Sequence, residues 1–452
     1  MPTTTIIYDA LTIVFAIITD KNKFLDTRTF YKLSRTSKKM KQILVDLPIQ
    51  ICVKNSFIDD NTILDSLKNA TVEYRIVALD LYGNKIGHDG AESLAGVPGL
   101  WTSLTHLNLY GNFIGPNGAK SLARVLVRAQ CRNLALKHLD LNWNLIGPKG
   151  AESLAGVLAQ CQMLSHLNLS CNKIGPEGAE CLARIPGLST TLTELDLGSN
   201  EIGPNGAKSL ARALVRAQCK SLTHLNLCDN KIGPNGAKSL AGVLAQCQML
   251  SHLNLSCNKI GPEGAECLTE VPGLSTSLTH LNLCDNKIGP NGAKSLARVL
   301  VRAQCSALTH LNLCNNSIGS KGAECLTGVL ALCQALTHLD LCDNKIGPNG
   351  AKSLTGVLPQ CSALTLLDLY GNKIGHDGAK SLAGVLSQCQ ALTNLDLCGN
   401  FIGPDGAKSL AGVLPQCSAL TYLNLRSNDI DFDASVLVRE QCHNLALKHL
   451  KL

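Results

Sequence analysis

Leucine, asparagine and glycine recur at a nearly fixed spacing along the chain from about residue 76 onwards. The segment 222–249, LTHLNLCDNKIGPNGAKSLAGVLAQCQM, shows the pattern most clearly. Its marker asparagine, which follows the letters CD, returns every 28 to 32 residues. A period in the range of about 20–50 residues indicates stacked structural repeats, each packed on its neighbours. The marker positions are Asn84, Asn112, Asn144, Asn172, Asn200, Asn230, Asn258, Asn286, Asn316, Asn344, Asn372, Asn400 and Asn428.

Each repeat predicts a strand, a turn and a helix. Leu225 and Leu227 alternate with a polar residue, as in a strand with one buried face. The Gly-Pro-Asn-Gly sequence at 233–236 favours a turn. We expect a helix to begin at Ala237, because apolar residues from Leu240 onwards are spaced four and then three positions apart. One such unit cannot bury its own leucines, whereas a stack of units builds a continuous core.

The marker asparagine, Asn230 in this copy, is expected to bond backbone groups that the turn leaves unpaired, since such groups are costly when buried. The pattern LxxLxLxxNxIGxxGAxxLxxxL resembles leucine-rich repeats of the ribonuclease-inhibitor type. This resemblance covers roughly residues 48–452. It implies an α/β fold, a right-handed curved solenoid with a parallel inner sheet and outer helices, preceded by a small all-helical module.

Residues 1–47 lie outside the repeat and carry eight Lys and Arg against four Asp and Glu. The apolar run Ala10–Ile18 follows Asp9, has no basic residue before it and is too short to cross a bilayer. We therefore expect neither a secretion signal nor a membrane anchor, and interpret the run as a first helix.

The segment 30–44, FYKLSRTSKKMKQIL, resembles the second half of the F-box, a short helical module. The resemblance implies that residues 1–47 bind the adaptor subunit of a cullin–RING ubiquitin ligase, through Leu11, Phe15, Phe30 and Leu33. The alternative is a helical cap over the first repeat, which a solenoid requires. A degenerate repeat at 48–75, with Ser56 in place of the marker asparagine, already offers such a cap, and residues 76–452 form the regular repeats.

The 21 cysteines follow the repeat rather than a pairing pattern. Their odd number favours reduced thiols and an intracellular protein of the cytoplasm or nucleus. No zinc-finger spacing occurs, so we expect neither a metal site nor a cofactor. Cys284, Cys314 and Cys342, on neighbouring predicted strands, come within disulfide reach, and we expect oxidation to crosslink them. Thirteen others are predicted to be small buried residues of the helices: Cys131, Cys161, Cys181, Cys219, Cys247, Cys267, Cys305, Cys325, Cys333, Cys361, Cys389, Cys417 and Cys442.

The outward side chains of the strands form the predicted binding face. A histidine column runs along it and offers two ligands to any one zinc ion, which prefers about four, so we interpret the column as a solvent-exposed ladder. Aromatic residues and arginine, the usual anchors of interfaces, gather towards both ends of the repeat array. The expected partner-binding residues are Tyr82, Tyr110, Trp143, His224, His252, His280, His310, His338, Tyr370, Tyr422 and Arg426.

These observations point to a protein-binding protein rather than an enzyme. The glycines of IGPxG are repeated turn residues and not a phosphate loop, and no catalytic constellation stands apart from the repeat. Nucleic-acid binding is not expected, because the net charge of +7 forms no basic stripe among aromatics. The favoured function is substrate receptor of an F-box type ubiquitin ligase, with a protein target on the concave face. The alternatives are a repeat scaffold or inhibitor whose N-terminus is only a cap, and a GTPase activator of similar repeat type.

Overall fold

The computed structural model describes residues 49–52, 76–97, 99–128, 136–185, 191–216, 221–244, 246–268, 277–302, 307–442 and 447–452. It divides into two compact units, residues 1–200 and residues 201–452. The predicted adaptor-binding residues Leu11, Phe15, Phe30 and Leu33 lie outside the described residues, as does most of the degenerate repeat.

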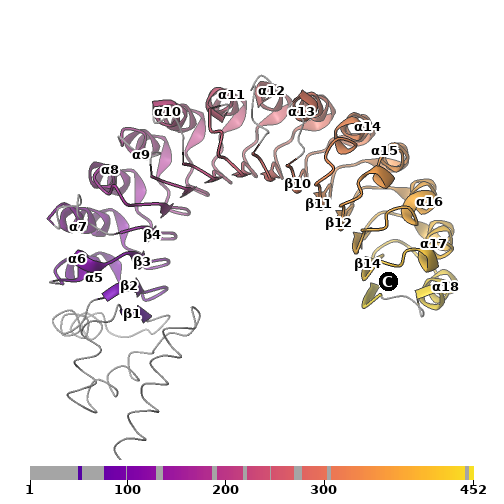
Figure 1. Cartoon of the computed structure of the whole chain (residues 1–452), viewed down its shortest axis with the longest axis horizontal. Coiled ribbons are helices and arrows are strands. Elements are labelled where there is room, and N and C mark those ends of the chain that lie inside the picture. Colours follow the sequence, from indigo (N-terminus) through magenta and orange to yellow (C-terminus); the bar gives the residue numbers. More distant parts are fainter. Residues whose placement is uncertain are drawn as a thin grey trace, which may run out of the picture. The chain divides into compact units, whose positions relative to one another are not determined.

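The first unit alternates strands and helices along the chain (Figure 1). Strand β1 pairs with β2 in parallel and places Ile51 opposite Leu79, a step of 28 residues. Each later strand of the unit pairs in parallel with the one before it. The elements are β1 (Ile49–Cys52), β2 (Ile76–Asp80), α5 (Gly87–Ala95), α6 (Leu100–Ser103), β3 (His106–Asn108), α7 (Gly115–Arg128), β4 (His138–Asp140), α8 (Gly147–Leu158), β5 (His166–Asn168), α9 (Gly175–Leu182) and β6 (Glu194–Asp196).

The second unit continues the same alternation, and its strands are again parallel and in chain order. Its elements are α10 (Gly203–Arg216), β7 (His224–Asn226), α11 (Gly233–Leu244), β8 (His252–Asn254), α12 (Gly261–Cys267), β9 (His280–Asn282), α13 (Gly289–Arg302), β10 (His310–Asn312), α14 (Gly319–Leu330), β11 (His338–Asp340), α15 (Gly347–Thr355), η3 (Leu358–Gln360), β12 (Leu366–Asp368), α16 (Gly375–Leu386), β13 (Asn394–Asp396), α17 (Gly403–Ala411), η4 (Leu414–Gln416), β14 (Tyr422–Asn424), α18 (Phe432–Cys442) and β15 (His449–Lys451).

Within each unit the strands line the concave side of the stack and the helices its convex side (Figure 1). Equivalent residues of successive repeats face each other across the sheet, for example His310 opposite His338 and Leu311 opposite Leu339. The predicted parallel sheet with helices on its outer side is therefore confirmed.

The helix of each repeat begins earlier than its pattern predicts. Helix α11 begins at Gly233, not at Ala237. The chain reverses before it, where Asp229 and Lys231 on either side of Asn230 take positive φ angles of 50° and 55°. Gly233 itself has φ 62°. A proline directly after it suits the first helical turn, because that position needs no backbone N–H donor. The Gly-Pro sequence is thus the start of the helix.

The leucine-lined core also buries the marker asparagines. Asn258 has no exposed surface. Its Oδ1 accepts hydrogen bonds from the backbone N–H of Asn230 at 3.0 Å and of Ile232 at 3.3 Å. Its Nδ2 donates to the carbonyls of Leu227 at 2.8 Å and Leu255 at 3.0 Å. The predicted role of the marker asparagine, to satisfy turn backbone groups, is confirmed, and the bonds join one repeat to the next.

None of the described helices has the length and apolar character needed to cross a bilayer.

Candidate binding face and cysteine–aspartate cluster

The polar residue at the end of each strand shapes the backbone that follows. Asn282 accepts a hydrogen bond through Oδ1 from the backbone N–H of Cys284 at 3.0 Å. Asp340 does the same for Cys342, also at 3.0 Å. Asparagine and aspartate favour this local turn because their short side chains reach the backbone two residues on. The turn holds the next side chain, a cysteine in both repeats, at a fixed place beside the strand end.

The predicted histidine column of the second unit is a stack of rings. Successive centroids from His224 through His252, His280 and His310 to His338 lie 3.9–4.1 Å apart. Burial, followed by the charges of neighbouring histidines, lowers the pKa of His280 to about 4. Burial also lowers the pKa of His310. His280 is therefore neutral at pH 7.

The hydrogen bonds of the preceding threonines determine the tautomer of these rings. Thr309 donates its hydroxyl proton to the carbonyl of Thr279 at 3.0 Å, and its Oγ1 lies 2.8 Å from Nδ1 of His310. Because a hydroxyl has one proton, Nδ1 of His310 must be the donor in the second bond. His338 is held in the same way by Thr337. In the neutral form of these rings, Nε2 then carries the lone pair and acts as an acceptor.

The first unit holds a shorter stack and three of the predicted anchors. His106, His138 and His166 stack with centroids 4.1 Å and 3.9 Å apart. Nε2 of His166 lies 3.2 Å from a carboxylate oxygen of Glu194. The rings of Tyr82 and Tyr110 stack at 4.7 Å, and Trp143 is 56% exposed.

The second unit holds the other three anchors. Tyr370 is 43% exposed and Arg426 is also exposed. Tyr422 is half-buried; its hydroxyl accepts a hydrogen bond from Nζ of Lys451 at 3.1 Å, and that ammonium lies 5.0 Å from the ring centroid.

Three exposed apolar residues were missed by sequence reasoning. Phe113, Leu145 and Phe401 directly follow a marker asparagine and are 51%, 45% and 60% exposed. Other repeats carry lysine at this position, for example Lys231. The signal that could have found them is this change from lysine to a large apolar residue.

One cysteine pair is covalently joined. Cys314 and Cys342, on the segments that follow β10 and β11, form a disulfide with a Cα–Cα distance of 4.6 Å. The prediction that these neighbours lie within disulfide reach is confirmed, whereas the expectation of reduced thiols is wrong for this pair. The physical reason is the 28-residue step, which places the two side chains side by side on adjacent strands. Cys284, one repeat earlier, is unbonded, and burial followed by nearby Cys257 and Asp340 raises the pKa of its thiol to about 11.

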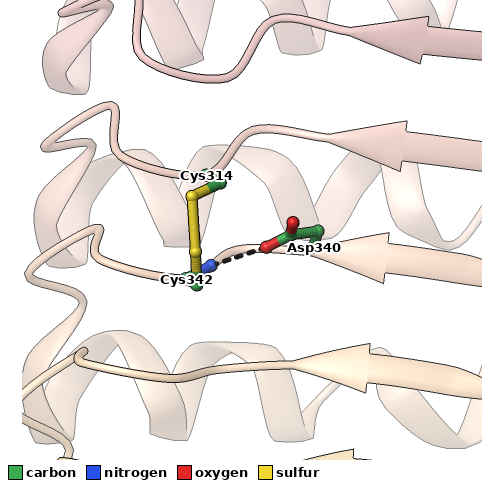
Figure 2. A group of neighbouring side chains, drawn as sticks. All are labelled: Cys314, Asp340 and Cys342. Carbon is green, nitrogen blue, oxygen red and sulfur yellow. Dashed lines mark hydrogen bonds between the residues drawn. A yellow bond between two sulfur atoms is a disulfide. The ribbon is translucent and has the colours of Figure 1, made fainter. Parts of the chain in front are cut away.

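The disulfide lies beside Asp340 (Figure 2). The sulfurs of Cys314 and Cys342 and a carboxylate oxygen of Asp340 all lie within 4.8 Å of one another. Across the described ranges, these three residues are the one group of at least three potential metal ligands that come so close. No single sequence motif contains the three residues, because they come from two repeats.

The helical cysteines are buried less uniformly than predicted. Cys161, Cys247, Cys333 and Cys361 are buried. Three of the thirteen, Cys131, Cys219 and Cys305, lie outside the described residues. The remaining six are only half-buried, and two of them, Cys389 and Cys417, follow the ends of α16 and η4 instead of lying in a helix: Cys181, Cys267, Cys325, Cys389, Cys417 and Cys442.

Comparison with known families identifies the repeat. The family model described as Leucine Rich repeat matches thirteen segments that together cover more than half of the chain. The chain belongs to the leucine-rich repeat family. The matched segments of this leucine-rich repeat protein are residues 76–95, 102–123, 132–155, 160–183, 188–211, 218–241, 246–268, 274–297, 304–326, 332–354, 360–383, 388–411 and 416–431.

Comparison with solved structures finds several similar chains. One is a leucine-rich repeat protein of Leptospira interrogans, with 20% identity over 95% of each chain and a TM-score of 0.52. A second is the complex of Rad7 and Elc1 from yeast, with 17% identity over 76% of this chain and 85% of that chain and a TM-score of 0.48. A third is an internalin of Listeria monocytogenes, with 17% identity over 86% and 88% and a TM-score of 0.40. No curated protein sequence matches the chain significantly. At 20% identity the likeness to the Leptospira interrogans protein concerns the fold alone.

Proposed function

We propose that this leucine-rich repeat protein binds a protein target on the strand side of its repeats and acts as a substrate receptor of an F-box type ubiquitin ligase. The observation that carries target binding is the concave face of the second unit. There, the repeat presents side chains in register, among them the acceptor rings of His310 and His338 and the exposed ring of Tyr370.

The chemistry of this face favours a target that donates hydrogen bonds. In their neutral form His310 and His338 present Nε2 lone pairs, and Asp340 and Asp368 add carboxylates to the next column. Tyr370 and Arg426 supply the large side chains that carry much of the binding energy in interfaces. A target segment rich in lysine or arginine, or one with exposed backbone N–H groups, would donate hydrogen bonds to these acceptors.

Adaptor binding rests on the F-box resemblance of residues 1–47, and a direct binding assay tests it. Purified ligase adaptor is offered to the full chain, to a chain that begins at residue 48, and to a full chain carrying both Phe30→Ala and Leu33→Ala. Phe432→Ala is the matched control, because this phenylalanine is 80% exposed and belongs to the second unit. We expect the full chain and the control to hold the adaptor, and the other two to lose it.

If neither the full chain nor the control holds the adaptor, the receptor function is refuted. Residues 1–47 would then serve as a cap of a ribonuclease-inhibitor-type scaffold or inhibitor.

Target binding is tested separately on the repeat surface. Crosslinked partners of the full chain are compared with those of Tyr370→Ala and of Lys352→Ala, whose exposed lysine belongs to helix α15. We expect the tyrosine variant to lose the specific partner and the lysine variant to retain it. Equal retention by both variants would place the target elsewhere.

A further inference from the structure

We propose that Cys314, Cys342 and Asp340 form a binding site for a zinc ion when the two cysteines are reduced. This site shares Asp340 with the proposed binding face, but ion binding needs neither an adaptor nor a protein target.

The positions of the three side chains fit one tetrahedral ion. Zinc binds thiolate sulfur at about 2.3 Å and carboxylate oxygen at about 2.0–2.2 Å, so around a tetrahedral ion two sulfurs lie about 3.8 Å apart and a sulfur and an oxygen about 3.6 Å apart. The three donor atoms of this group lie within 4.8 Å of one another, so small side-chain rotations bring all of them to one ion (Figure 2). The Cα atoms of the two cysteines lie 4.6 Å apart, so both side chains start from neighbouring positions.

The donor types select the ion. Two thiolates and one carboxylate suit zinc, whereas magnesium and calcium take oxygen ligands. Three protein donors leave one of the four zinc positions for water or for a donor atom of a bound molecule.

Neighbouring repeats show why the site forms here. Cys284 and Cys314 also lie on adjacent strands, but the strand-end residues beside them are Asn282 and Asn312, which are uncharged. Cys398 has an aspartate two residues before it, Asp396, whose Oδ1 accepts its backbone N–H at 2.9 Å. The strand on one side of Cys398 presents Tyr370 and the strand on the other presents Arg426, so a second thiol is missing there. A thiol pair and a carboxylate coincide at Cys314, Cys342 and Asp340.

Loading of the site requires two chemical steps. Two molecules of a small thiol transfer two electrons to the Cys314–Cys342 disulfide, which gives two cysteine thiols and one small-molecule disulfide. Zinc then replaces the two thiol protons, which are released to solvent. The disulfide and the bound ion use the same sulfur atoms and exclude each other.

The experiment measures ion binding to the full chain in both redox states. The protein is reduced with dithiothreitol, freed of reductant without oxygen, and titrated with Co²⁺ as a spectroscopic probe, followed by displacement with Zn²⁺. We expect one equivalent of Co²⁺ with sulfur-to-cobalt charge-transfer absorption and the visible bands of a tetrahedral ion. Zinc should displace it, and oxidised protein should not bind.

Two variants and one control locate the ion. Cys342→Ser should lose the bound equivalent, and Asp340→Asn should weaken zinc binding at least about tenfold, the smallest effect usual for a group that supports a metal. Cys398→Ser is the matched control and should bind as the unchanged chain does. Each replacement is a residue that other repeats carry at the same position, Ser256 for the cysteines and Asn312 for the aspartate, so the strands should keep their fold.

Three outcomes would overturn the proposal. In the first, Cys342→Ser retains the same equivalent as Cys398→Ser, which assigns the ion to other thiols. In the second, Asp340→Asn binds zinc as tightly as the unchanged chain, which removes the carboxylate from the site. In the third, the oxidised chain binds as well as the reduced chain.

Discussion

Replacing Asn258 by alanine tests the hydrogen-bonded asparagine ladder that joins the repeats. The side chain is fully buried and its Oδ1 is the acceptor for the N–H groups of Asn230 and Ile232. Its Nδ2 donates to the carbonyls of Leu227, Leu255 and Ser256, at 2.8, 3.0 and 3.0 Å. Alanine removes all five contacts and adds none.

The two backbone N–H groups determine the size of the effect. Leaving one buried donor without a partner costs about 1–3 kcal/mol, so two cost about 2–6 kcal/mol. Loss of the three bonds to carbonyl oxygens costs less free energy. Each carbonyl oxygen has a second lone pair, and the two protons of Nδ2 were shared among three carbonyls. We therefore expect Asn258→Ala to lower the free energy of unfolding by about 4 kcal/mol. A water molecule in the vacated space would reduce this value, since it can bond two to four polar groups.

Asn254→Ala is the matched control four residues away. Asn254 faces outwards, is half-buried and accepts hydrogen bonds from the backbone N–H of Ser256 at 3.0 Å and its hydroxyl at 2.8 Å. Solvent can replace this acceptor, so the expected loss is no more than about 1 kcal/mol.

Urea unfolding followed by circular dichroism gives the midpoints of both variants. Hydrogen exchange of the Asn230 and Ile232 amides reports the local effect, which is needed because long repeat arrays can unfold in more than one step. Equal midpoint shifts in both variants, with the two amides exchanging at their original rates, would refute this role of Asn258.

Two further perturbations follow from the packing and the histidine stack. A Cβ at Gly378 would lie 2.5 Å from Cγ2 of Ile374 and 3.2 Å from Cα of Pro348, so Gly378→Ala should lower the free energy of unfolding by about 1–3 kcal/mol. Gly384, in the same helix, has no such neighbour within 4 Å. Gly384→Ala should therefore leave the free energy of unfolding unchanged or raise it by up to about 1 kcal/mol. The pKa of His280 is about 4 in the folded protein against an ordinary value of 6.5, so the unfolded chain binds the proton first as the pH falls. The free energy of unfolding should therefore decrease between pH 6.5 and about 4. A titration followed by NMR should give a pKa near 4 for His280, and His280→Asn should reduce the dependence of the free energy of unfolding on pH in that range.

The sequence period predicted most of the fold, because one repeat determines the positions of all the others. It placed leucines such as Leu225 and Leu227 in the core and assigned the marker asparagine its role. It placed the helix start at Ala237, since glycine and proline indicate a turn as well as a first helical turn. The chain reverses before Gly233 through the positive φ angles of Asp229 and Lys231, and the residue types at these two positions do not indicate such angles.

The chemistry of the face was less accessible to sequence reasoning. The histidine column was evident, but its tautomer depends on the threonine hydroxyl of one repeat reaching the carbonyl of the previous repeat, as Thr309 does to Thr279. The register also placed Cys314 beside Cys342, yet the presence of Asp340 next to their sulfurs required side-chain directions. Spacing rules for metal sites look along one segment and overlook ligands that come from two strands.

The repeat itself indicates where distinct functions should be sought. A residue that recurs in successive repeats, such as Leu339 opposite Leu311, serves the packing that all repeats share. It therefore does not mark a binding site in one particular repeat. A specific site therefore requires residues that depart from the common pattern, because only these distinguish one strand from its neighbours. Asp340 is the first aspartate at its position after the asparagines Asn226, Asn254, Asn282 and Asn312, and it lies beside a cysteine pair, whereas Tyr370 replaces the cysteine of the preceding repeat. The two departures occur in successive repeats of the second unit, so an ion held by Asp340 would lie one repeat away from an exposed aromatic anchor of the proposed binding face. Comparing target binding with zinc-loaded and disulfide-bonded protein would show whether the two sites act together.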